Sequence, residues 1–148
     1  MLSLLYISRC IVPEDQWSAA LADVQSASAA ENSVFDITGL LIATPDWFAQ
    51  ILEGPPENID LAMAGILADP RHSGIRILRR LMINRRRFPL WRLARFDHGA
   101  FEASHVRPAL EQAYEGAGER ALGALDRLID RLLPEGHRNW PGNGTRHA

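Results

Sequence analysis

The chain has 148 residues and a formal net charge of −2, with 47% hydrophobic and 23% charged residues. This composition excludes a mainly disordered chain and indicates one globular domain. No apolar run reaches the roughly 18–20 residues needed to cross a bilayer, and the near-neutral charge argues against a general nucleic-acid binder. The N-terminus lacks a secretory leader pattern, and the single Cys10 cannot form an internal disulfide. We therefore expect a cytoplasmic protein, and the cysteine and histidine spacing predicts no metal site.

The first half of the chain carries strand and helix patterns in turn. Residues 2–8 are apolar on both faces of a predicted strand, which indicates that the strand is covered on both sides. Pro13 and the two acids after it open a helix that should end near Asn32. Residues 37–43 and 47–53 are predicted strands, and the Thr-Pro-Asp turn between them predicts a hairpin.

The middle of the chain repeats the pattern with a second helix and two more strands. Residues 54–57 open this helix, and Asp69 with the following proline stops it. Residues 75–83 and 90–96 are predicted strands joined by a turn. Seven arginines fall between Arg79 and Arg95, and we interpret them as a solvated hairpin face.

The C-terminal part of the chain predicts two further helices, at residues 104–115 and 118–133, the second with a clear apolar face. Residues 136–148 show no periodicity and are expected to form a flexible tail. The element order βαββαββαα predicts an α+β fold of the ferredoxin-like type, with a mixed five-stranded sheet. The first two helices should cover one face of the sheet, and the two C-terminal helices should cover the other.

Two polar side chains stand out within the predicted strands. Gln50 lies in the middle of an apolar central strand, where its amide must find hydrogen-bond partners. Tyr6 lies on the same strand face as Leu2 and Leu4. If both side chains face the helices, they can meet and bond to each other. The alternative is a glutamine bonded to neighbouring backbone and a core tyrosine whose hydroxyl is satisfied at the edge.

Further polar residues gather at the ends of the two predicted helices. Ser28 and Asn32 share one helix face, and Asp69, Arg71 and His72 follow the second helix. Taken separately, they fit a helix cap and a surface turn. Taken together with the strand residues, they outline a slot with apolar walls and a few directed polar groups. A planar heterocycle with several donors and acceptors would fit such a slot.

Five segments match a known family in order and in spacing. They are residues 4–9, 32–41, 48–55, 69–72 and 87–91. Over about residues 2–96 the chain resembles the BLUF domain, a flavin-binding sensor of blue light. The resemblance implies non-covalently bound FAD, with FMN as a possible substitute.

The resemblance also implies roles for single residues. Tyr6 matches the tyrosine that donates an electron and a proton to the excited flavin, and Gln50 matches the glutamine whose amide rearranges on illumination. Asn32 matches the asparagine at the polar edge of the flavin ring, with Ser28 beside it. Ser8 matches a serine near the tyrosine.

A second group of residues is implied around the rest of the cofactor and in signal output. Asp69, Arg71 and His72 match residues near the ribityl chain and the far side of the ring. Trp91 matches a tryptophan linked to signal output. Leu93 departs from the family, which commonly has a methionine there, and this change removes a polarizable thioether. Glu31 is a second departure, at a position where some relatives carry a ring-stacking side chain.

The resemblance implies a photosensory protein rather than an enzyme. We expect a flavin-binding domain at 1–98, a helical cap at 99–135 and the flexible tail at 136–148. Output is expected through the C-terminal helices, to an unknown downstream protein or to a homo-oligomer, with little part for residues 85–87. The alternatives are a flavin enzyme and a ferredoxin-like interaction module without photoactivity. The colour of the purified protein separates the sensor from a flavin-free module.

Overall fold

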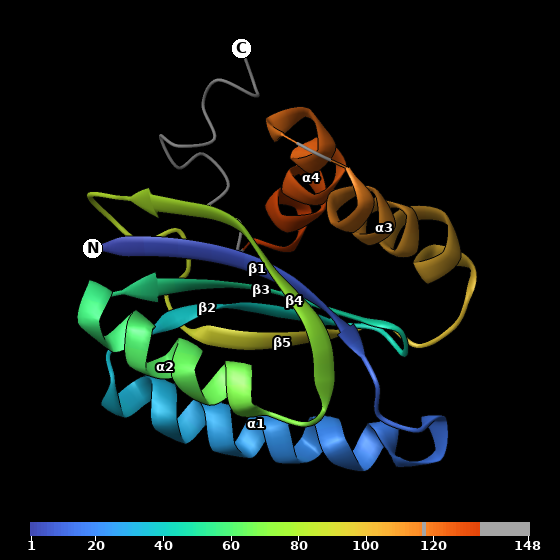
Figure 1. The fold of residues 1–148 in the computed structure, drawn as a ribbon, viewed down its shortest axis with the longest axis horizontal. Helices are drawn as coiled ribbons and strands as arrows, with labels where there is room; N and C mark the ends of the chain where they lie inside the picture. Colours follow the sequence, from blue (N-terminus) through green and yellow to red (C-terminus); the bar gives the residue numbers. More distant parts are fainter. Residues whose placement is uncertain (117, 134–148) are drawn as a thin grey trace.

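The computed structural model describes residues 1–116 and 118–133, and these form a five-stranded sheet with helices on both faces (Figure 1). The strands are β1 (Leu2–Cys10), β2 (Thr38–Ala43), β3 (Trp47–Gly54), β4 (His72–Met82) and β5 (Trp91–Arg95). The longer helices are α1 (Trp17–Val34), α2 (Pro56–Ala68), α3 (Arg107–Glu115) and α4 (Gly123–Leu132). Short helical turns occupy Glu14–Gln16, Glu102–Val106 and Glu119–Leu122. The expected tail at 136–148 lies outside the described residues.

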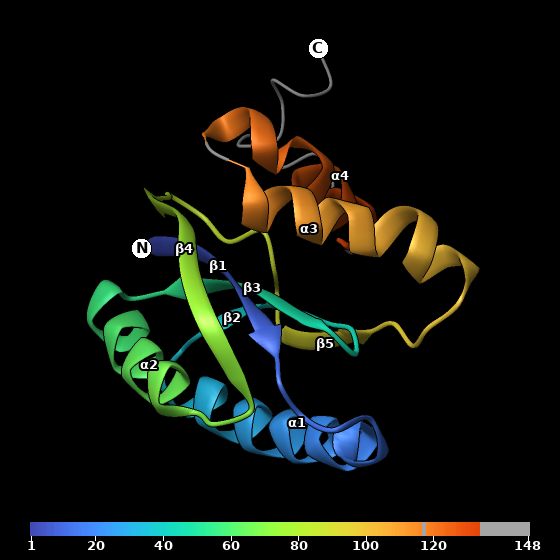
Figure 2. The same ribbon diagram turned by 45° about the vertical axis from the view of Figure 1, so that its right-hand side comes forward.

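The strand order in the sheet is β4-β1-β3-β2-β5. All neighbouring strands are antiparallel except β2 and β5, which run parallel. Helices α1 and α2 lie on one face, and α3 and α4 lie on the other (Figure 2). The predicted α+β ferredoxin-like fold, with a mixed sheet between two helical layers, is therefore confirmed.

The two faces of the sheet hold separate apolar cores. Strand β1 contributes to both, because alternate side chains point to opposite faces. Leu5 and Ile7 join a single large cluster with α3 and α4. Leu2, Leu4 and Tyr6 belong to a cluster under α2. A third cluster, which includes Trp17 of α1, covers the other end of that same face.

The expected hairpin between the last two strands is wrong. Strand β5 joins the far edge of the sheet next to β2, so β4 and β5 lie at opposite edges. The connection, residues 83–90, passes across one end of the sheet. Its arginines and those of β4 are therefore not one solvated face. Arg79 forms an ion pair with Asp126 of α4, and Arg87 is only 5% exposed and forms an ion pair with Asp130 of the same helix.

Gly39 in β2 is fixed by close approach of the neighbouring strand. Its φ of 155° and its distance to β3 leave no room for a side chain, since a Cβ there would lie 1.9 Å from the Ile51 carbonyl oxygen. The glycine in this family-like segment therefore permits tight β2–β3 pairing. Among the described helices, none is both long and apolar enough to span a membrane.

Candidate functional site

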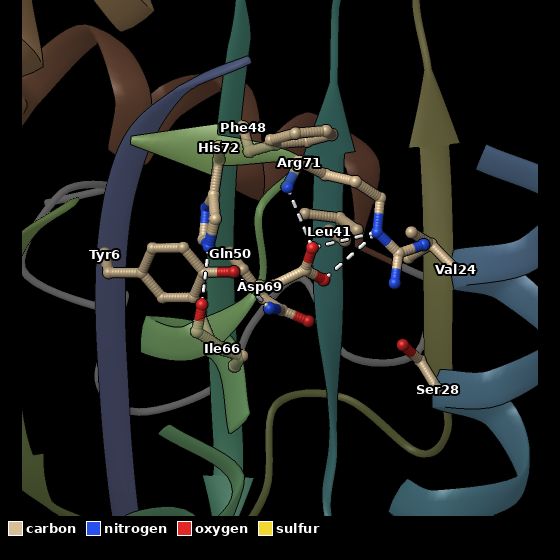
Figure 3. A pocket seen from close by; sticks show the side chains of 10 residues that line it. All are labelled: Tyr6, Val24, Ser28, Leu41, Phe48, Gln50, Ile66, Asp69, Arg71 and His72. Atoms are coloured by element: carbon tan, nitrogen blue, oxygen red, sulfur yellow. Dashed lines mark hydrogen bonds and ion pairs between the residues drawn. The ribbon is translucent and has the colours of Figure 1, made fainter. Parts of the chain in front are cut away.

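Two adjoining cavities lie between α1, α2 and the sheet. The smaller has a volume of about 70 Å³ and the larger about 470 Å³. They share the lining residues Val24, Ser28, Gln50, Ile66, Asp69 and Arg71. Figure 3 shows the smaller cavity, with Tyr6 and Gln50 from the sheet on one side and Ser28 from α1 on the other. The larger volume falls within the range of roughly 300–1,000 Å³ that is typical of small-molecule and cofactor sites.

Tyr6 and Gln50 form a hydrogen-bonded pair in the wall of the smaller cavity. The antiparallel register of β1 and β3 places them directly opposite each other. The Gln50 Nε2 donates to the Tyr6 hydroxyl over 2.7 Å, and both side chains are buried. Burial raises the pKa of Tyr6 far above its ordinary value, so the phenol stays protonated.

The other end of the Gln50 amide contacts β5. The Trp91 Nε1 donates to the Gln50 Oε1 over 2.9 Å. An indole N–H is a donor only, so it fixes the oxygen of the amide towards Trp91 and the NH₂ group towards Tyr6. Gln50 of β3 therefore links Tyr6 of β1 to Trp91 of the edge strand β5, and both ends of its amide form a hydrogen bond.

His72 is held by hydrogen bonds on both sides of its ring. Its Nε2 lies 2.6 Å from the carbonyl oxygen of Ile66, and its Nδ1 lies 2.7 Å from the Ser8 hydroxyl. A carbonyl only accepts, so Nε2 carries the proton; in the neutral ring Nδ1 then accepts from Ser8. The ring also makes edge contacts with Tyr6 and Phe48. Ser8 is fully buried and does not line either cavity, so its contact with the site is the hydrogen bond to His72.

Asp69 and Arg71 form a charged pair at the rim of both cavities. The Arg71 Nε donates to both carboxylate oxygens of Asp69, at 2.9 and 3.1 Å, and its backbone N–H donates to one of them. Partial burial acts to raise the pKa of Asp69, but the bonds from Arg71 outweigh it and lower that pKa. The carboxylate is thus ionised at neutral pH.

Ser28 and Asn32 stand one turn apart on α1. Ser28 lines both cavities, and Asn32 lines the larger one and is 8% exposed. Within residues 1–116 and 118–133, neither side chain hydrogen bonds to another residue. Their hydroxyl and amide groups therefore remain available to a ligand. Glu31 also lines the larger cavity, although its side chain is otherwise exposed.

The structure brings together nearly all the residues expected at the site. The direct contact of Trp91 with Gln50 was not predicted, because no local sequence signal shows which strand β5 joins. Apolar walls were expected, but the residues that form them, Val24, Leu41 and Ile66, were not identified. The position of Val24, one turn before Ser28, could have indicated the first of them. Leu93 packs beside the smaller cavity against the cluster that holds Leu41.

The ferredoxin-like sheet, the cavities between the helices and the buried tyrosine–glutamine pair are the features expected from the resemblance to a flavin-binding photosensory domain. The family model described as "Sensors of blue-light using FAD", BLUF, matches residues 1–94. The chain belongs to the BLUF family.

Similar curated proteins match over 69 residues, 47% of this chain. The photoactivated adenylate cyclase subunit alpha of Euglena gracilis is 35% identical, and the match covers 7% of its length. The blue light- and temperature-regulated antirepressor BluF of Escherichia coli (strain K12) is 32% identical, with 17% of its length covered. The matched segment is therefore a small part of these relatives.

Solved structures resemble nearly the whole described chain. BlrB, a BLUF protein in its dark state, is 29% identical with a TM-score of 0.71, covering 89% of this chain and 96% of its own. Klebsiella pneumoniae BlrP1 with FMN and cyclic diGMP is 25% identical with a TM-score of 0.59, covering 92% of this chain and 36% of its own.

Proposed function

We propose that this chain is a blue-light photoreceptor that binds FAD non-covalently between α1 and α2 and signals through the Tyr6–Gln50 pair. The observation that carries the proposal is the Gln50 amide, which bonds Tyr6 with one end and Trp91 with the other beside the cavities. An amide with different groups at its two ends can change its pattern of bonds without breaking a covalent bond.

The residues around the cavities fit a flavin. The unbonded side chains of Ser28 and Asn32 supply a hydroxyl and an amide for the polar edge of a ring, and Val24, Leu41 and Ile66 supply apolar walls. Arg71 and His72 would lie towards the ribityl chain, with Asp69 fixing the guanidinium of Arg71. When bound, the flavin supplies a chromophore that becomes a strong oxidant after absorbing blue light.

We infer that Tyr6 supplies an electron and a proton together. Because the buried phenol is neutral, loss of an electron creates a cation in an apolar site, and release of the proton relieves that cost. The Gln50 NH₂ group faces the phenol oxygen over 2.7 Å and donates to it, so Gln50 would relay that proton only through its Oε1, once the amide has turned this oxygen towards Tyr6. Rotation or tautomerisation of the amide would then exchange its donor and acceptor ends.

Trp91 would transmit this exchange of bonds to residues outside the cavities. If the NH₂ group of Gln50 turns towards Trp91, two donors face each other and the bond between them is lost. A hydrogen bond of this kind contributes about 0.5–1.5 kcal/mol, up to roughly a tenfold shift in an equilibrium. Trp91, with Leu93 two residues further on, therefore carries the signal into β5.

The proposed organisation is a photosensory domain at residues 1–98 and a helical cap at 99–135, without catalytic activity in this segment. The cap would pass the signal to a downstream protein or to a second copy of the chain in the cytoplasm. The relatives named as cyclases and as an antirepressor support this view, because similar domains occur there in proteins with different outputs.

An absorption spectrum before and after blue light tests the proposal. We expect a yellow protein with oxidised flavin and a small, reversible red shift after illumination. Extraction and chromatography of the flavin would separate FAD from FMN. A colourless protein that takes up no flavin when refolded with excess FAD would exclude the proposal. A yellow protein without a light-induced shift would favour the flavin-enzyme alternative.

A further inference from the structure

Glu53 is an acidic residue buried at the end of β3. It lies three residues after Gln50, on the opposite face of the strand, and its exposed fraction is 0%. Its Oε1 accepts hydrogen bonds from the backbone N–H groups of Arg87, at 2.7 Å, and Phe88, at 3.1 Å. Its Oε2 has no hydrogen-bond partner among the described residues. Burial raises the pKa of Glu53, while these N–H groups and the nearby arginines oppose the rise. Burying a carboxyl group costs stability unless it is hydrogen-bonded. The hydrogen bonds that the Glu53 side chain accepts come from one segment, which suggests that it serves to hold that segment.

The segment that Glu53 holds leads directly into β5. Arg86 links the same segment to the β2–β3 hairpin. Its guanidinium donates to the carbonyl oxygen of Glu53 and to the Thr38 hydroxyl, each over 2.8 Å. The carbonyl oxygen of Leu90 then accepts from Gly39 of β2 over 3.2 Å. The next residue is Trp91. The bonds to Glu53 thus hold the segment just before Trp91, while the contact of Leu90 with β2 brings Trp91 into the sheet.

The same segment also reaches the helices on the other face. The Arg87 backbone is bound to Glu53, and its side chain forms an ion pair with Asp130 of α4 over 3.0 Å. The side chains of Arg87 and Asp130 are only 6% and 12% exposed. A buried, charge-assisted contact of this kind is stronger than a surface ion pair. One short segment therefore joins Trp91, on the cavity side, to α4, on the packed side.

We propose that Glu53 is a positioning residue that fixes the segment 86–90 and couples a movement of Trp91 to α4 through Arg87 and Asp130. This inference rests on the proposed photoreceptor function. It also replaces the expectation that residues 85–87 take little part in output. Glu53 touches neither Tyr6 nor the cavities, so it acts on the signal and not on the photochemistry.

Two variants of Glu53 separate its hydrogen-bonding role from a merely structural one. Glu53→Gln keeps an acceptor oxygen for the two N–H groups, whereas Glu53→Met has a similar volume but only a weak acceptor. In the dark, we expect amide exchange at Arg87 and Phe88 to be about tenfold faster in Glu53→Met and close to wild type in Glu53→Gln. In the light, the red shift should persist in both variants. The light-induced change in α4 exchange should be lost in Glu53→Met and kept in Glu53→Gln.

Two further variants serve as a second test and a control. Asp130→Asn weakens the ion pair with Arg87 from the α4 side, so it should reduce the light-induced change in α4 exchange. The dark protection of the Arg87 and Phe88 amides should stay as in the wild type. This variant tests the inference even if Glu53→Met does not fold. Tyr114→Phe removes the bond from the Tyr114 hydroxyl to the Gly74 carbonyl, a cap contact at the other edge of the sheet. It should leave the light response of α4 unchanged.

Two results would overturn the inference. One is a wild-type light response of α4 in both Glu53→Met and Asp130→Asn, and the other is a Glu53→Gln variant that behaves like Glu53→Met. Failure of the proposed function is distinguishable, because then the wild-type protein itself shows no red shift. The dark exchange at Arg87 and Phe88 would still report whether Glu53 holds the segment.

Discussion

The two faces of the sheet are built in opposite ways. The face under α3 and α4 carries one continuous apolar cluster. The face under α1 and α2 is divided into two clusters, with the cavities and their polar groups between them. Helix α4 buries four of its ten residues, Leu125, Asp126, Leu128 and Ile129, whereas α1 buries only three of eighteen, Trp17, Leu21 and Asn32. Close packing of α3 and α4 on one face of the sheet can supply the stability that the loosely packed face with the cavities lacks.

The largest expected effect comes from removing the polar pair on the hollow face. Gln50→Leu keeps similar volume but has no donor or acceptor, so the light-induced red shift should vanish completely while flavin stays bound. Tyr6→Phe should also abolish it, because the phenol that supplies the electron and proton is gone. Difference spectra check both variants. Leu67→Ala is the control, since this exposed residue of α2 lines neither cavity. A normal reversible shift in Gln50→Leu would show that this residue is not the switch.

Two leucine truncations compare a packed position on one face of the sheet with an exposed position at the cavity on the other face. Leu125 of α4 is fully buried in the cluster that faces the sheet, whereas Leu61 of α2 lines the larger cavity and is 60% exposed. Leu125→Ala should lower the free energy of unfolding by about 2–5 kcal/mol, and Leu61→Ala by less than about 0.5 kcal/mol. Urea denaturation of the flavin-free proteins measures both. Equal losses would mean that the two faces contribute alike.

A ligand should stabilise the hollow face in a way that depends on Asn32. At free flavin about 100 times its Kd, binding adds about 2.7 kcal/mol to the free energy of unfolding. Asn32→Ala removes an amide available to the ligand, so flavin affinity should fall about tenfold and this gain should drop to about 1.4 kcal/mol. Ser33→Ala, an exposed neighbour on the same helix, is the control. Flavin titration followed by thermal melting of each variant measures the affinity and the stability gain. An unchanged Kd for Asn32→Ala would contradict the predicted role of its amide.

The smallest expected effect concerns the pH dependence of the cap. Arg107 donates to the buried carboxylate of Glu102 and lowers its pKa below 4.5, although desolvation opposes this. A carboxyl with a lowered pKa stabilises the fold above its ordinary pKa, and that contribution is lost as pH falls through the folded value. Glu102→Gln should therefore cost about 1 kcal/mol at pH 7 and progressively less below pH 4.5. Urea midpoints at pH 7, 4.5 and 3 test this, and a difference independent of pH would refute it.

The sequence predicted the element order and both helical layers, because these follow from local patterns and strand periodicity. It offered the meeting of Tyr6 with Gln50 as one of two possibilities. It did not predict the place of β5. That strand pairs parallel to β2 after some fifty intervening residues, and no turn motif marks such a pairing. The misreading of Arg87 and the missed contact of Trp91 with Gln50 both follow from this single error. The beginning of β4 was also placed too late, so His72 was assigned to a turn although it lies in the strand.

The wide sequence separation of the residues around the cavities has a consequence for folding kinetics. Gln50 lies 44 residues from Tyr6 and 41 from Trp91, and the hairpin of β2 and β3 is the one local strand pair in the described sheet. Closing such long loops costs entropy before any contact is gained, so β1 and β5 should join the hairpin late. A flavin then has no complete site until the rate-limiting step has passed. We expect bound flavin to leave the refolding rate nearly unchanged and to act almost entirely by slowing unfolding.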